Sequence, residues 1–143
     1  MSPCAQVNLD GYALPVKKIE GTDPVETLDL SRKSLGVASA VVIASLIGVN
    51  GGLTALDLSF NNLNDEGVSA VCEAIQSNKE TKLASLNMGA NSISPIGAKS
   101  VASMVAVTGT LMECDVSNNG MGKEGKASIL SAAQGKAGFN LHL

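Results

Sequence analysis

One pattern of apolar positions recurs four times along this chain. Its clearest copy, LTALDLSFNNL at positions 53–63, has the form L-x-x-L-x-L-x-x-N-x-L. The same phase returns at positions 25–35, 83–93 and 111–121, with other apolar residues replacing single leucines. In the first copy Lys33 stands where the others have asparagine, which leaves the shape of that turn open. Copies spaced by 28 or 30 residues indicate a structural repeat, and a repeat of this length predicts a solenoid.

Each repeat is predicted to hold a short strand followed by a helix. In the strand, Leu56 and Leu58 point to one face, and Asp57 between them points to the other. Each helix contains a small residue near its start, which is Ser39, Gly67, Gly97 or Gly125. Apolar residues stand four and eight positions after this small residue. These are Ile43 and Ile47, Val71 and Ile75, Val101 and Val105, and Ile129 and Ala133. This spacing places one helical face against the sheet.

Repeats of this length, with LDLSFNNLNDEGVSAVCEAI in the second copy, resemble the ribonuclease-inhibitor-like class of leucine-rich repeat. The resemblance covers residues 25–138. It implies an α/β fold, a right-handed solenoid with parallel β-strands on the concave face and α-helices on the convex face. We expect about four repeats, at 25–52, 53–82, 83–110 and 111–138. They lie between an N-terminal tail and cap at 1–24 and a terminal strand at 139–143.

The composition narrows the classes of partner. Only 16% of the residues are charged, against a usual ~25%, so the surface is unusually neutral. A net charge of -3 argues against nucleic acid, which requires a basic patch. The longest apolar run, at 35–49, is too short to span a bilayer. We therefore expect protein partners and no transmembrane segment, and peripheral contact with a membrane complex stays open.

The cysteines indicate a reducing compartment. There are three, an odd number without a disulfide spacing. Cys114 occupies a core position of its strand and Cys72 lies on a helix, so both are predicted to be small buried hydrophobes. Cys4 is predicted to lie in a tail. No signal peptide is visible at the N-terminus. The predicted location is therefore intracellular, in the cytoplasm or an organelle interior, and not secreted.

No set of residues suited to catalysis stands out. His142 is the single histidine, and no metal-ligand spacing is present. GMGKEGKA at 120–127 matches part of a phosphate-binding loop, but Ala127 stands where the metal would need serine or threonine. The repeat phase already explains Gly125. We predict that the chain is not an enzyme and needs no cofactor.

Polar side chains are predicted to gather on the concave face. They are Asp29, Asp57, Asn87, Glu113, Asp115 and His142. Because neighbouring strands lie ~5 Å apart, these side chains form a small acidic surface suited to a basic or hydroxyl-rich segment of a partner. The alternative is that they only solvate an exposed sheet, since this face lacks the aromatic and arginine side chains that dominate interface energies.

The outer helices are predicted to be unusually apolar. The first, at 35–48, has no charged residue, and a helix that is apolar all round is normally buried. Its cover is either the segment 1–24, a partner protein or lipid-embedded complex, or a second copy. Within 1–24, the residues predicted to cap the core edge of the first repeat are Tyr12, Leu14, Val16 and Ile19. The candidate partner contacts on the convex face are Val41, Val42, Ser45, Met104 and Val107.

Together these features predict a non-enzymatic protein–protein interaction module. The preferred hypothesis is a small structural or accessory subunit docked in a multi-subunit complex. The alternative is a free adaptor or regulator, inhibitor-like or GTPase-activating-like as the resemblance implies, which binds through the acidic concave face. The sequence names neither the partner nor the organelle.

Overall fold

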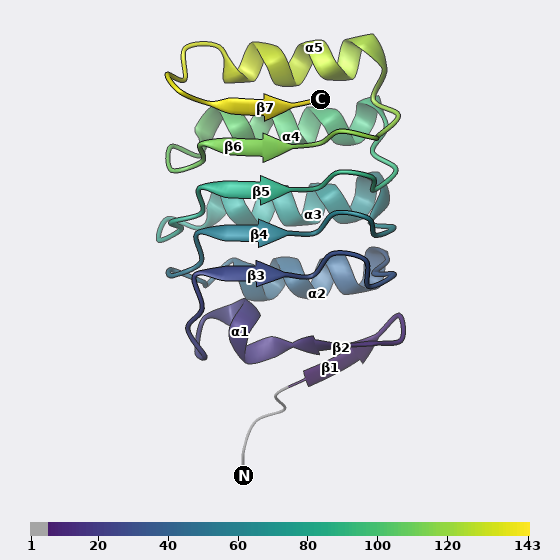
Figure 1. Ribbon diagram of the computed structural model, residues 1–143, viewed down its shortest axis with the longest axis vertical. Helices are drawn as coiled ribbons and strands as arrows, with labels where there is room; N and C mark the ends of the chain where they lie inside the picture. Colours follow the sequence, from purple (N-terminus) through teal and green to yellow (C-terminus); the bar gives the residue numbers. More distant parts are fainter. Residues whose placement is uncertain (1–5) are drawn as a thin grey trace.

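The computed structural model describes residues 6–143 as a single stack of strand–helix units (Figure 1). In chain order the elements are β1 (Gln6–Leu9), β2 (Tyr12–Pro15), α1 (Val16–Glu20), β3 (Thr27–Asp29), α2 (Val37–Ile47), β4 (Ala55–Asp57), α3 (Asn64–Ser77), β5 (Ser85–Asn87), α4 (Pro95–Val107), β6 (Glu113–Asp115), α5 (Gly122–Ala133) and β7 (Asn140–His142).

The strands form one parallel sheet in chain order, β3-β4-β5-β6-β7. Each strand pairs with the strand one repeat later, so Leu28 lies beside Leu56 and Leu86 beside Cys114. Helices α2 to α5 run behind the sheet as a second layer (Figure 1). Each parallel strand is joined to the next through a helix, and such connections are right-handed in nearly all proteins. The result is a right-handed solenoid with strands on the concave face. The predicted fold class is confirmed.

The core lies between the two layers, at the positions that the periodicity marks. Within the four repeats, the inward strand residues and the predicted helix residues are buried to 9% exposure or less, apart from Ala133, which is half-buried. The glycines Gly67, Gly97 and Gly125 each lie where their helix meets the preceding one. At Gly67, for instance, a Cβ would stand 2.8 Å from the Cβ of Ala40 on α2. The glycine therefore permits a helix spacing that a larger side chain would not.

The asparagines hold neighbouring repeats together through backbone hydrogen bonds. Asn91 donates to the carbonyl of Leu58 in the preceding repeat (2.8 Å), and its Oδ1 accepts from the N–H of Leu63 (3.2 Å). Asn61 and Asn119 bond in the same way. The residue before this position has a left-handed φ in every repeat; these residues are Arg32, Phe60, Ala90 and Asn118, at 53–58°. The first turn therefore keeps the common backbone shape at this residue despite Lys33.

Residues 6–24 form a hairpin and one short helix against the first repeat. Asp10 and Gly11, both with positive φ, make the two-residue turn between β1 and β2. Leu14 and Ile19 are fully buried in the continuous core, and Tyr12 and Val16 are half-buried.

Asp10 also joins this segment to α2. Its Oδ2 accepts from the N–H of Gly36 (2.9 Å) and from the hydroxyl of Ser39 (2.5 Å). These hydrogen bonds lower the pKa of Asp10 below its ordinary value of 3.8, and the bond from the Ser39 hydroxyl contributes most. The carboxylate thereby satisfies N–H and O–H donors at the start of the first repeat helix.

The other end of the stack is the strand β7. Leu141 pairs beside Cys114 and His142 beside Asp115, so the two leucines Leu141 and Leu143 point inward and the histidine outward, as predicted. Both leucines are half-buried. Within residues 6–143, no helix combines the length and the apolar character needed to cross a bilayer.

Candidate functional site

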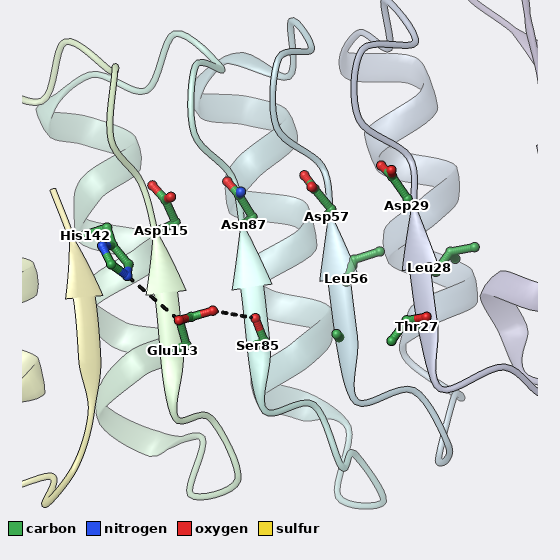
Figure 2. A pocket seen from close by; sticks show the side chains of 11 residues that line it. Thr27, Leu28, Asp29, Leu56, Asp57, Ser85, Asn87, Glu113, Asp115 and His142 are labelled. Atoms are coloured by element: carbon green, nitrogen blue, oxygen red, sulfur yellow. Dashed lines mark hydrogen bonds and ion pairs between the residues drawn. The ribbon is translucent and has the colours of Figure 1, made fainter.

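The six predicted concave residues line a single groove. The strand register aligns Asp29, Asp57, Asn87, Asp115 and His142 as one row across the five strands (Figure 2). Glu113 belongs to a second row beside it, together with Thr27, Ala55 and Ser85. The groove between them has a volume of about 500 Å³.

Three polar side chains contact one another in series across the C-terminal end of this groove. Ser85 donates to Oε1 of Glu113 (3.0 Å), and Oε2 of Glu113 lies 3.8 Å from Nε2 of His142 (Figure 2). The histidine and the glutamate are both about half-exposed. The contact with His142 becomes an ion pair only when the imidazole is protonated, and in water it is weak.

The aspartates of the groove also build the turns that follow the strands. The N–H and the hydroxyl of Ser59 both donate to Oδ1 of Asp57 (2.9 and 2.6 Å), and Asp29 and Asp115 bind Ser31 and Ser117 alike. Among the described residues, nothing donates a hydrogen bond to their Oδ2 atoms, which stay available to a partner. The hydrogen bonds from Ser31, helped by the charge of Lys33, lower the pKa of Asp29.

The predicted convex residues do not form one surface. Val41 and Val107 are 51% and 64% exposed, Ser45 is exposed, and Val42 is half-buried. Met104 is fully buried, so its prediction as a surface contact is wrong. The physical reason is its spacing: seven positions after Gly97 it lies two helical turns further along the same inward face.

A shallow hollow of about 500 Å³ lies over α3 on the convex side. Its lining residues are Val41 from α2, Asp65, Glu66, Ser69, Ala70 and Glu73 from α3, and Ile96 from α4. Ile96 is 71% exposed and was not among the predicted contacts. Its position immediately before Gly97 corresponds to that of Glu66 before Gly67, which is the signal that could have revealed it.

Two contacts between a basic side chain and an aromatic ring are also missing from the predicted set. The guanidinium carbon of Arg32 stands 3.9 Å from the centroid of the Phe60 ring, and Nζ of Lys33 stands 5.3 Å from that of Tyr12. Arg32 and Phe60 occupy the same position of successive repeats, 28 residues apart, so the repeat phase could have paired them. Arginine and aromatic side chains are frequent in the energetic centres of interfaces.

Cys72, Cys114 and the glycine of the segment that matched a phosphate loop all have structural roles. Burial raises the pKa of the Cys114 thiol to about 12 and also raises that of Cys72, so neither is an activated nucleophile. Cys4 lies outside the described residues. The segment that matched a phosphate loop is the start of α5, and a Cβ on its Gly125 would stand 3.0 Å from the Cβ of Ala98. This glycine serves helix packing. Within residues 6–143, no three His, Cys, Asp or Glu side chains cluster as a metal site.

Comparisons with known proteins agree with this architecture. The family model described as Leucine Rich repeat matches residues 53–72. The chain is 36% identical over 101 residues to mouse NACHT, LRR and PYD domains-containing protein 12, covering 71% of the chain and 10% of that protein. It is 33% identical over 108 residues to mouse ribonuclease inhibitor, covering 76% of the chain and 24% of the inhibitor.

Two further similarities point the same way. RAN GTPase-activating protein 2 of Arabidopsis thaliana is 28% identical over 106 residues, which are 74% of the chain and 19% of that protein. The solved structure titled Leiomodin-1 Actin-Binding Site 2 superposes with a TM-score of 0.74 at 15% identity, covering 90% of this chain and 78% of that one, and shows the shared fold. The chain spans between about a tenth and a quarter of the length of these curated relatives.

Proposed function

Because the chain is a leucine-rich-repeat protein of the ribonuclease-inhibitor-like class, we propose that it acts as a small accessory subunit docked in a larger assembly. Leucine-rich repeats are mostly binding modules without catalysis, and two of the relatives are named as an inhibitor and a GTPase-activating protein. A protein-interaction domain is therefore the general function. The subunit role is the finer statement and rests on the convex surface.

The observation that carries the proposal is the open apolar face of α2. This helix has no charged residue, and residues 6–24 leave Val41 51% exposed. The neighbouring α3, by contrast, carries the charged residues Glu66 and Glu73 on its exposed side. An uncharged outer helix is unfavourable in water and favourable against a protein partner. The two described cysteines, both free and buried, support the accompanying proposal of a reducing intracellular compartment.

The test is to charge this face and follow the native size of the protein in a gentle extract. Val41→Lys should move the protein from high-mass fractions toward its own mass of 14.5 kDa. Because Val41 is half-exposed, the free energy of unfolding should change by no more than about 0.5 kcal/mol. Leu130→Lys is the control, since Leu130 is equally exposed at 53% but lies on α5. If Val41→Lys stays with the assembly as the control does, this docking face is excluded.

A second candidate is a free adaptor that binds a basic or hydroxyl-rich segment in the concave groove. The favouring observation is that all six predicted concave residues line that groove. The best variant is Asp57→Asn with Asp115→Asn, because an asparagine keeps the Oδ1 acceptor of the turn. Asn87 already accepts from the N–H of Gly89 in this way (2.9 Å). Loss of partner binding by this double variant would favour the adaptor, and unchanged binding would exclude it.

A further inference from the structure

The hollow over α3 has a shape and a charge pattern that specify the chemistry of an occupant. Small side chains, Ser69 and Ala70, lie in the middle of its lining on α3. Val41 on α2 and Ile96 on α4, 51% and 71% exposed, contribute its large apolar side chains. Exposed aliphatic side chains beside a hollow form a surface that gains free energy when an apolar side chain of a partner fills it.

Carboxylates lie at both ends of this apolar floor. Glu66 and Glu73 are seven residues apart on α3, so they lie on the same helical face, ~10.5 Å apart along the axis. Both are exposed, and the described residues supply neither a hydrogen bond nor an ion pair to either carboxylate. The lining of the hollow contains no basic residue. The two charges are therefore available to a partner.

The third carboxylate of the hollow has a structural task. The oxygens of Asp65 accept from the N–H and the hydroxyl of Ser94 (2.7 and 2.5 Å) and from the N–H of Gly97 (3.1 Å), at the start of α4. Asp65 thus strengthens the negative field of the hollow but is not free to form a new contact.

We propose that this hollow docks a cationic amphipathic helix of a protein partner, laid along α3. The spacing of Glu66 and Glu73 requires a lysine or arginine at positions i and i+7 of that helix. A large apolar side chain at i+3 or i+4 then lies over Ser69 and Ala70 and contacts Val41 and Ile96. This inference rests on the proposed function, because it names the chemistry of the partner that the open convex face binds.

The test uses a designed helical peptide and the full chain. One labelled peptide carries lysines at i and i+7 and leucines at i+3 and i+4, and a matched peptide carries glutamates at the lysine positions. Fluorescence anisotropy at low ionic strength should show binding of the lysine peptide only. Glu66→Gln with Glu73→Gln should weaken it about four- to 25-fold, since each exposed ion pair contributes about two- to fivefold. Raising the salt concentration should weaken it as well.

The control is Glu80→Gln with Glu124→Gln, which removes the same charge from exposed glutamates outside the hollow. This variant should bind the lysine peptide as the unmodified chain does. Equal binding of the two peptides, or unchanged binding by the Glu66 and Glu73 variant, would overturn the proposal. So would self-association of the chain that this variant abolishes, because the occupant would then be a second copy.

Failure of this inference can be told apart from failure of the proposed function. If Val41→Lys is released from the assembly while the Glu66 and Glu73 double variant remains in it, only this inference fails. In that case the convex face docks a partner, but not through lysine or arginine contacts with Glu66 and Glu73. If the unmodified chain elutes near 14.5 kDa, the subunit role itself is wrong.

Discussion

Removing the amide of Asn91 should destabilise the whole solenoid. The side chain is fully buried, and it joins the second repeat to the third. In Asn91→Ala, the N–H of Leu63, itself fully buried, loses the acceptor Oδ1 of Asn91. An orphaned buried N–H costs about 1–3 kcal/mol. The carbonyl of Leu58 loses its bond to Asn91 but keeps the one from Asn61 (3.0 Å), a further loss of about 1 kcal/mol.

The expected change in the free energy of unfolding is therefore about 2–4 kcal/mol, a large part of the ~5–15 kcal/mol typical of a folded domain. Urea unfolding followed by circular dichroism should show the midpoint lowered by about 1–2 M, while the slope of the unfolding free energy against urea concentration (the m-value) stays unchanged. Asn62→Ala is the matched control, because Asn62 is exposed and its side chain makes no hydrogen bond within the described residues. If both variants lose equally little, the asparagine ladder does not carry the stability assigned to it.

Three further predictions concern the cap, the helix packing and the thiols. The lowered pKa of Asp10 implies stability that is present above pH 3.8 and lost as the pH falls through the folded-state pKa. Asp10→Asn should therefore be less stable than the unmodified chain near neutral pH and equally stable well below pH 3.8. A difference in stability that stays constant with pH would refute the assignment to this carboxylate. Gly67→Ala should lower the free energy of unfolding by about 1–3 kcal/mol, because the new Cβ would lie 2.8 Å from the Cβ of Ala40 on α2. Gly109→Ala, with open space around the new Cβ, should change the stability little. Equal effects of the two variants in thermal unfolding would exclude tight packing at Gly67. Cys72 and Cys114 should resist alkylation at pH 8 until denaturant is added, as followed by site-resolved mass spectrometry, and prompt labelling would contradict their burial.

The repeated part of the chain was predictable because each side chain has a counterpart one repeat away. The parallel register aligns Asp29 with Asp57 and Asp115 with His142, so a column read along the sequence becomes a row in space. Burial of the inward strand positions follows from the same alternation. The residues of the concave groove therefore follow from the repeat phase of the sequence.

The rest depended on contacts that the repeat does not encode. The hairpin turn at Asp10 and Gly11 has no periodic copy, although the Asp-Gly pair is a typical turn signal. Met104 was placed on the wrong face because a residue two turns from Gly97 returns to the core. The repeat phase places Arg32 and Phe60 at the same position of successive repeats, but it does not specify that the guanidinium packs on the ring.

The native size of the unmodified protein in a gentle extract, with the co-eluting proteins identified, decides whether the chain is a subunit of a larger assembly. If a partner covers the uncharged face of α2, as proposed, the protein should elute at a mass far above 14.5 kDa and the same proteins should co-elute with it in every preparation. Elution near the mass of a monomer would contradict the subunit role and favour the free adaptor that binds through its concave groove.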